Sequence, residues 1–518
     1  MKQGTNSIEK LKAEKNGLDI LDEIEALAQE HGGWESMDAT TRERLKWIGT
    51  FYRKPTPGEF MMRVRITSGQ ATATQLRALA ALAGSQGNGI LDITTRQQIE
   101  LRAIRMASVP QILDALAGVD LTSLQTGMDN VRNVNTCPLA GLTPSELLDA
   151  STAAMELTQT FVGNREFTNL PRKFNVTITG CRENCTHTET QDLGMTPAVR
   201  RSDGVAGFNV IVGGKMGSGG MTVAQPLDVF LDPADAAAFA AQVILLFRDE
   251  GQREQRSRAR LAFLIEDWGI EKVRAEMETR WGRPLEPAQI DVRSRGKSDH
   301  LGAQLQKQPG LCSVGLSVPA GRLTSDDLSE LARLSDAYGS GHLRLTPDQN
   351  LILVDIPEEK VAALAAEPLL RRLSPEAHPF VRGLVSCTGT DYCNMALIET
   401  KTLGRELSER MAARYSSSQP LTMNWSGCPA GCGNHQAADI GFQGAKARID
   451  GEVVDAVSIF VGGRTGPDAR PGERLMELVP VSLLDEIMPL VINNLETLKK
   501  VRKVEVAEEA VIMVPALP

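Results

Sequence analysis

The sequence predicts an α+β protein made of two related halves with pseudo-twofold symmetry. Residues 65–104 align without a gap to residues 317–356, at an offset of 252. Each copy reads strand, helix, turn, strand, with apolar residues three or four apart, such as Leu76, Leu79 and Leu82, in the helix. Pairs of cysteines also recur in both halves. A long internal repeat indicates a duplicated structural unit, so we expect both halves to share one architecture.

The repeat continues beyond these segments with small shifts in offset. Val131-Arg132 matches Val381-Arg382, Cys137 matches Cys387, Cys181-x3-Cys185 matches Cys428-x3-Cys432, and Val212-Gly-Gly-Lys215 matches Val461-Gly-Gly-Arg464. The copies differ at two informative positions. The first half has Thr143 where the second has Cys393, and the second has Asp348 where the first has Arg96. One half is therefore equipped for a metal cluster and the other for anions, and a single site between them would use both.

These breaks in the repeat predict five segments along the chain. They are a helical N-terminal extension (1–55), a first half-domain (56–125), a larger α/β domain (126–300), a second half-domain (301–375) and a second larger α/β domain (376–518).

Composition narrows the class of protein. The formal charge is 56 − 65 = −9, and aromatic residues make up 4% of the chain. A general nucleic-acid binder would be basic and would offer aromatic stacking platforms, so we expect no nucleic-acid partner. No window reaches the roughly 18 apolar residues of a membrane span, and the N-terminus has no apolar signal region. We expect a soluble cytoplasmic protein, a monomer with no membrane contact.

A metal centre is predicted in the second half. Four cysteines form two pairs among small and turn-forming residues: Cys387-x5-Cys393 and Cys428-x3-Cys432. Thiolates are soft ligands that select iron–sulfur clusters, zinc or Cu(I). Zinc is the main alternative to an iron–sulfur cluster. Structural zinc sites usually place two to four residues between the cysteines of a pair, whereas Cys387 and Cys393 have five between them. A further alternative is that the four cysteines are unrelated residues of the hydrophobic core and bind no metal. The spacing favours an iron–sulfur cluster, and disulfides are not expected without an export signal.

A set of cations is predicted in the first half. Its members are Arg63, Arg65, Arg96, Arg102, Arg132, Arg172 and Lys173. Arginine presents a planar fork suited to carboxylates and oxyanions, and lysine a compact charge that can donate a proton. Any one of them alone would most simply be a surface residue. Together they predict a site for an anion.

These motifs, in this order, resemble one family. The motifs are TTRQ at 94–97, NVRN at 130–133, LPRKFN at 170–175, the two cysteine pairs and the duplicated half-domains. From about Pro55 onward the chain resembles the sirohaem-containing assimilatory nitrite and sulfite reductases. The resemblance implies a pseudo-twofold duplicated fold, with two ferredoxin-like half-domains and two larger α/β domains that bind sirohaem and a cluster.

The resemblance also implies roles for individual residues. Cys387, Cys393, Cys428 and Cys432 would hold a [4Fe–4S] cluster, and Cys432 would bridge it to the sirohaem iron. Arg96, Arg132, Lys173 and Asn175 would line the substrate face of the sirohaem. Arg63, Arg65, Arg102 and Lys215 would meet its carboxylates.

The implied reaction is the six-electron reduction of nitrite to ammonia. Sulfite reductases of the family usually have Lys-x-Lys in the LPRK segment, whereas this chain has Lys173-Phe174-Asn175. A neutral amide suffices for singly charged nitrite, which favours nitrite, with sulfite as the alternative substrate. No G-x-G-x-x-G fingerprint follows a strand, so we do not expect NAD(P)H to be the direct electron donor. The resemblance implies ferredoxin, an acidic protein, as the donor, and we expect it to bind at a local basic patch. A related cobalamin-pathway monooxygenase and a non-enzymatic redox sensor are two further candidate functions.

Several residues stand outside this scheme. Cys181 and Cys185 are either relics of the duplication or a metal-binding or redox-active pair; Cys137 could join them, but three thiolates without a fourth predict no second cluster. Cys312 reads as a core strand residue. The segment GGKMGSGG lacks the Gly-Lys-Ser/Thr of a phosphate loop and reads as a turn. We expect His187 and His435 to hydrogen-bond beside the cysteine pairs and not to bind metal.

Overall fold

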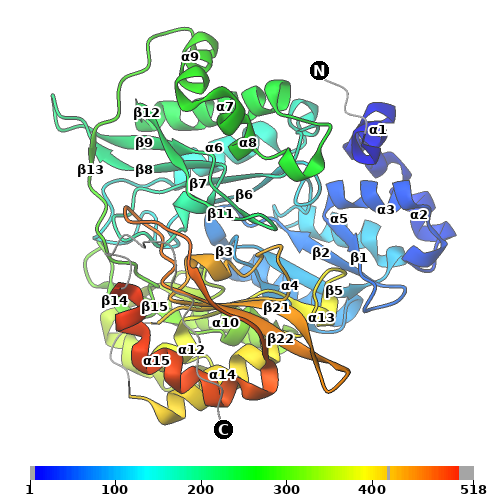
Figure 1. The fold of residues 1–518 in the computed structure, drawn as a ribbon, viewed down its shortest axis with the longest axis vertical. Helices are drawn as coiled ribbons and strands as arrows, with labels where there is room; N and C mark the ends of the chain where they lie inside the picture. Colours follow the sequence, from blue (N-terminus) through cyan, green and yellow to red (C-terminus); the bar gives the residue numbers. More distant parts are fainter. Residues whose placement is uncertain (1–5, 417–420, 501–518) are drawn as a thin grey trace.

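The computed structural model describes residues 6–416 and 421–500, so the ends of the first and last predicted segments lie outside it. Two five-stranded sheets form the centre of the molecule (Figure 1). The first runs in the order β1 (Thr50–Tyr52), β2 (Phe60–Val64), β5 (Ile99–Ile104), β4 (Ile90–Ile93), β16 (Arg322–Thr324). The second runs β14 (Gly302–Leu305), β15 (Leu311–Leu316), β18 (Leu351–Pro357), β17 (His342–Leu345), β3 (Gln70–Thr72).

Each of these sheets ends on a strand contributed by the other half. Strand β16 pairs with β4 of the first half, and β3 pairs with β17 of the second. The helices that follow the exchanged strands, α4 (Ala73–Gln86) and α10 (Ser325–Tyr338), pack against each other. Both begin with a capping box, from Thr72 to Gln75 and from Thr324 to Asp327. One hydrophobic core therefore runs through both half-domains.

Two glutamines at matching positions join the halves. Gln97 and Gln349 both have positive φ, 55° and 64°. The Gln97 amide donates to the Leu345 carbonyl at 2.9 Å, and the Gln349 amide donates to the Ile93 carbonyl at 2.9 Å. Leu345 is the counterpart of Ile93 at the offset of 252. The predicted pseudo-twofold relation is thus confirmed down to single hydrogen bonds.

Two larger sheets flank the centre, one in each half. One runs β12 (Gln225–Leu231), β9 (Ala206–Val212), β8 (Leu193–Val199), β7 (Phe174–Ile178), β6 (Val131–Asn135), with β13 (Ile290–Asp291) beside β8. The other runs β19 (Leu384–Ser386), β20 (Met423–Ser426), β21 (Ile440–Ile449), β22 (Glu452–Val461), β23 (Glu473–Pro480). In both sheets the first three strands in the chain pair in parallel and the fourth returns antiparallel.

Helices cover these larger sheets (Figure 1). The first carries α6 (Ser151–Phe161), α7 (Ala236–Glu250), α8 (Leu261–Trp268) and α9 (Ile270–Trp281), and the second carries α12 (Pro379–Arg382), α14 (Lys401–Arg414) and α15 (Leu484–Lys500). Shorter elements are α5 (Val109–Ala117), α11 (Val361–Ala365), α13 (Gly389–Tyr392) and the hairpin of β10 (Lys215–Gly217) and β11 (Gly220–Thr222). This hairpin is the turn predicted for GGKMGSGG.

The N-terminal segment is helical. It forms α1 (Ser7–Glu14), α2 (Ile24–Glu30) and α3 (Ala39–Arg44) before β1 begins. Ion pairs fasten α1 to the first large domain: Lys12 lies 3.4 Å from Asp129, and Arg253 lies 2.9 Å from Glu9. Among the described residues, no helix has the length and apolar content needed to cross a bilayer.

The parallel strands position the cysteines. Cys387 follows β19 directly and Cys428 comes two residues after β20. The carboxyl ends of neighbouring parallel strands meet at one edge of a sheet, where α/β proteins commonly bind ligands. Cys312, in contrast, is buried in β15, as predicted.

Candidate metal and anion site

The four predicted cluster cysteines line one cavity. Cys387, Cys393, Cys428 and Cys432 surround a space of about 200 Å³ between the second large domain and the β4–β5 region of the first half-domain. Cys432 is exposed and the other three are partly buried. The fold therefore brings together, around one cavity, two cysteine pairs that are separated by 34 residues in the sequence. A [4Fe–4S] cluster requires four thiolates gathered in this way.

Backbone amides support these sulfurs. The Gly427 amide donates to the sulfur of Cys387 at 3.1 Å, and the Met395 amide donates to that of Cys393 at 3.4 Å. Such bonds stabilise thiolates and tune the potential of a bound cluster. Gly431, between Cys428 and Cys432, has φ of +69°, and a Cβ there would lie 2.9 Å from the Met216 side chain. The loop accordingly needs glycine at this position.

Burial keeps two of these cysteines as thiols until metal arrives. It raises the pKa of Cys387 to about 11, with the neighbouring Cys432 adding to the rise, and it also raises the pKa of Cys428. Metal binding must then displace protons, so loading of the site should be favoured at higher pH.

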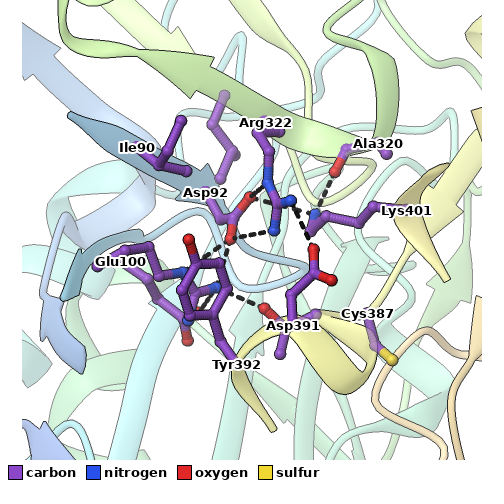
Figure 2. A network of polar contacts seen from close by, with 12 residues as sticks. Ile90, Asp92, Glu100, Ala320, Arg322, Cys387, Asp391, Tyr392 and Lys401 are labelled. Carbon is purple, nitrogen blue, oxygen red and sulfur yellow. Dashed lines mark hydrogen bonds and ion pairs between the residues drawn. The ribbon is translucent and has the colours of Figure 1, made fainter. Parts of the chain in front are cut away.

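A charged network, shown in Figure 2, contributes to the lining of the same cavity. Asp92 accepts from Arg102 at 2.8 Å and from Arg322 at 3.0 Å, and Lys401 lies 3.4 Å away. All these residues except Arg322 line the cavity, and Cys387 lies beside the network in Figure 2. Sequence reasoning missed Asp92, Arg322 and Lys401.

The repeat does carry a signal for this network. Asp92, Glu100 and Arg102 of the first copy stand opposite Arg344, Ile352 and Val354 of the second at the offset of 252. These three charged residues of the first copy line the cluster cavity, and in the second copy their charge is either reversed or absent. A comparison of the two copies therefore indicates the residues that face the cavity.

A second, smaller cavity adjoins the first. Both are lined by Thr95, Arg96 and Cys432, and the second is also lined by Lys173 and Asn175. Cys432 therefore faces the cluster cavity on one side and the cationic cavity on the other. Three of the four residues assigned to the substrate face thus meet at Cys432 or adjacent to it.

The two cations of this second cavity are partly buried, and no described residue pairs with them directly. Among the described residues, neither the Arg96 guanidinium nor the Lys173 ammonium has a hydrogen bond or an ion pair. Burial lowers the pKa of Arg96 to about 10, with a further contribution from the nearby Arg63. Burial also lowers the pKa of Lys173 and Arg132 well below their usual values, and Arg96 depresses both further. Buried like charges of this kind are costly unless an anion binds among them.

Polar atoms in the same region also lack partners. The Nη1 atom of Arg132 and the Oδ1 atom of Asn175 are buried without a hydrogen bond in the described structure. Unmet donors in buried arginines fit a large group with many carboxylates, because each carboxylate would accept from them. The residues present therefore fit a polyanionic macrocycle such as sirohaem.

The four residues expected to meet sirohaem carboxylates lie in different places. Arg63 and Arg102 line the cluster cavity and are paired with Glu100, at 2.7 Å and 2.6 Å. Arg65 lines neither cavity; its guanidinium donates to the carbonyls of Arg132, Leu124 and Val131.

Lys215 lies on β10, with its ammonium 5.4 Å from the centre of the Phe263 ring. Burial lowers its pKa.

The two histidines hydrogen-bond, as expected. His435 lies 3.0 Å from the Ser426 hydroxyl, and burial lowers its pKa to about 4. His187 lies 2.9 Å from Asp348, the residue that replaces Arg96 in the second copy. Cys181 and Cys185 lie with Cys137 in a separate buried group, which also contains His300.

Duplicated half-domains and a cysteine-lined cavity beside buried cations define the class of protein: an oxidoreductase that reduces an anion with electrons from a metal cluster. A family model described as "Nitrite and sulphite reductase 4Fe-4S domain" matches residues 127–285 and 377–503. A second, "Nitrite/Sulfite reductase ferredoxin-like half domain", matches residues 52–119 and 304–370. The chain belongs to the nitrite and sulfite reductase family, so the predicted family, fold and cofactors, sirohaem and a [4Fe–4S] cluster, are confirmed.

Individual relatives agree with this assignment. The chain is 47% identical to ferredoxin–nitrite reductase of Synechococcus elongatus, over 93% of this chain and 95% of that protein. It is 40% identical to the chloroplastic ferredoxin–nitrite reductase of Zea mays, over 95% of this chain and 89% of that protein. The structure of Mycobacterium tuberculosis NirA superimposes with a TM-score of 0.88 at 31% identity, covering 95% of this chain and 93% of that one.

Proposed function

We propose that this enzyme reduces nitrite to ammonia with electrons from reduced ferredoxin. Cys387, Cys393, Cys428 and Cys432 would hold the [4Fe–4S] cluster, and Cys432 would also ligate the sirohaem iron. The position of Cys432, which lines both cavities, is the observation that carries the proposal. The relatives named as ferredoxin–nitrite reductases support both the substrate and the donor.

The chemistry divides between the cofactors and the chain. When bound, the sirohaem and the cluster would supply electrons one at a time to the substrate. Reduction of nitrite to ammonium and two waters consumes six electrons and eight protons, so proton supply matters as much as electron supply. The depressed pKa of Lys173 makes its ammonium a ready proton donor, while Arg96 and Arg132 stabilise negative charge on the oxygens.

Asn175 is the residue that favours nitrite. Its amide lines the cationic cavity beside Lys173, and its carbonyl oxygen is buried without a partner in the described structure. A second ammonium at this position would suit the more highly charged sulfite. The neutral side chain adds no further positive charge to the cavity, and a neutral amide is sufficient for a monovalent anion.

A competition assay tests this proposal. Purified enzyme reduced with methyl viologen receives equal nitrite and sulfite, and ammonium and sulfide are both quantified. We expect ammonium in large excess, and we expect Asn175→Lys to raise the ratio of sulfide to ammonium. Excess sulfide from the unaltered enzyme would instead support the sulfite reductase alternative.

The monooxygenase alternative is disfavoured by two cations that line this cavity, Arg96 and Lys173, and by Arg132, which lines neither cavity. Oxidation of a macrocycle has little use for Arg96, Arg132 and Lys173, whereas reduction of an anion uses all three. A redox sensor without sirohaem would leave these buried cations uncompensated.

The ferredoxin site is proposed near Cys393. Met395 is 67% exposed, and the exposed Lys54 lies beside this loop because its backbone amide donates to Asn394 at 2.8 Å. Ferredoxin is acidic, so a lysine here would steer and hold it. Lys54→Glu should raise the apparent KM for ferredoxin and leave turnover with methyl viologen unchanged.

The matched control is Lys10→Glu, at an exposed lysine on α1. It should change neither activity. An equal fall in dye-driven turnover in Lys54→Glu would contradict this docking face.

A further inference from the structure

Four side chains that the proposed reaction does not use converge in the first half. Cys137, Cys181, Cys185 and His300 are each at most 3% exposed. Their ligand atoms all lie within 4.8 Å of one another. In the part of the chain that the structure describes, no other three His, Cys, Asp or Glu side chains meet this limit. Three thiolates and one imidazole are the donor set of a structural zinc site.

The spacing of the donor atoms suits a single ion. The sulfur of Cys137 lies 3.4 Å from Nε2 of His300. Tetrahedral zinc, with bonds of about 2.3 Å to sulfur and about 2.0 Å to nitrogen, places such ligands about 3.5 Å apart. Cys137 and His300 therefore already stand near the separation that one ion would impose, and the other ligand atoms lie within 4.8 Å of them.

The surroundings orient the ligands. The other ring nitrogen of His300, Nδ1, lies 3.3 Å from the Ser298 hydroxyl and 3.7 Å from a carboxylate oxygen of Glu183. A metal-binding histidine usually donates its second N–H to such a partner, which leaves Nε2 for the metal. The Glu183 amide also donates to the Cys181 sulfur at 3.4 Å, as the Met395 amide does to Cys393.

The site occupies the symmetry-related position of the cluster cavity. Cys137, Cys181 and Cys185 match Cys387, Cys428 and Cys432, and Thr143 stands where the fourth cluster cysteine would be. From the sequence alone the set had only three thiolates. The fold supplies the fourth ligand from a different segment, because residues 292–300 return to this loop and bring His300 with them.

The neighbouring wall argues against a second cluster. Where the cluster cavity faces Glu100 and Arg102, this group packs against Ile352 and Val354. A cube of four irons also holds its thiolates further apart than one ion does. We propose that the first half binds one Zn²⁺ through Cys137, Cys181, Cys185 and His300.

The ion would fasten the connection between the two halves. Residues 292–300 link the first large domain to β14, and they already bond to the same loop: the Ser294 amide to the Arg182 carbonyl at 2.8 Å, and the Ser298 amide to the Glu183 carbonyl at 3.0 Å. Lys297 lies 2.9 Å from Asp348 in the second half. Zinc would thus stabilise the assembled protein and take no part in electron transfer.

Metal analysis of the holoenzyme tests the proposal. Enzyme washed with a chelator is analysed for zinc and iron by mass spectrometry. We expect one zinc per chain in addition to the iron of the sirohaem and cluster. Cys185→Ser and His300→Ala should lower zinc to below about a tenth per chain, while the visible absorbance of the iron cofactors is retained.

The buried Cys312 provides the matched control, since Cys312→Ser should keep its zinc. For variants that do not fold, cobalt-grown enzyme of unaltered sequence gives a second readout: tetrahedral Co²⁺ bands with sulfur-to-cobalt charge transfer. Absence of zinc and of these bands would overturn the proposal. So would four additional irons per chain, or zinc that persists in folded His300→Ala and Cys185→Ser.

Discussion

Three cations near the two cavities are expected to lower the free energy of unfolding. Arg132 is a buried cation and Arg96 and Lys173 are partly buried ones, and desolvation lowers the pKa of each. A protein selected for stability alone would not keep them, because uncompensated buried charge is unfavourable. The proposed function explains their presence, because a bound anion would compensate their charge.

Lys173→Met therefore has opposite effects on stability and activity. Removal of the buried ammonium should stabilise the cofactor-free protein by about 1 kcal/mol or more, because the desolvation penalty disappears. Loss of the proton donor should lower kcat for nitrite by about 100-fold or more. Urea denaturation and methyl viologen assays measure the two effects. A variant that is less stable and fully active would contradict both roles.

His435 gives the protein a pH-dependent stability. Its pKa is about 4 in the folded state, against 6.5 for an ordinary histidine, so the unfolded chain binds the proton more tightly. The contribution is complete above about pH 6.5 and is lost as the pH falls toward 4, by up to about 3 kcal/mol. In His435→Gln, the thermal midpoint should fall less between pH 7 and pH 4.5 than in the unaltered protein. Equal falls in both proteins would show that His435 is not the titrating group.

At the scale of elements, the two halves use the same devices. Helices α4 and α10 begin at matching positions with matching capping boxes, although one has Gln75 and the other Asp327 at the third position. The hydroxyl of Thr72 or Thr324 accepts from the backbone of the first turn in each case. The duplication has therefore preserved the local signals for helix formation while the functional residues diverged.

Thr72→Ala and Thr324→Ala should consequently have similar effects. Each removes one capping bond and should cost about 1 kcal/mol of stability. Denaturant midpoints of the two variants and of the double variant give the comparison. A large difference between the single variants would mean that the capping boxes are not equivalent.

The repeat made much of the fold and site predictable from the sequence. The half-domains, the four cluster cysteines and the cations of LPRKFN follow from aligned copies and short motifs. Arg65 shows the limit of this reasoning, since it resembles its neighbours in sequence but is committed to three backbone carbonyls. His300 was missed because it reaches its site through a long return of the chain, and Lys401 because its partner Asp92 lies in the other half; neither relation leaves a local pattern.

At the scale of the whole molecule, neither half is complete by itself. The sheet of each half-domain needs the strand β3 or β16 from the other, and α4 packs on α10. The adjoining cavities also draw their cysteines from one half and the cations proposed to bind substrate, Arg96 and Lys173, from the other.

Residues 1–300 and 301–518, produced separately, should accordingly be insoluble or unfolded. Produced together in one cell, they should associate and regain the visible absorbance of the cofactors. Size-exclusion chromatography and absorbance spectra distinguish the cases. A soluble, folded first half alone would contradict the importance of the exchanged strands.

The exchanged strands also have a consequence for folding during synthesis, because the two strands of a pair are made at different times. Strand β3 begins at residue 70 and is synthesised early, but its partner β17 begins only at residue 342. At about 5–20 residues per second, the edge of β3 waits about 14–54 seconds for that partner. Until then the nascent chain displays an unpaired strand to every neighbouring polypeptide, which is a risk of misassembly. Faster translation of residues 73–342, or a chaperone bound early, should thus raise the yield of native enzyme in the cell.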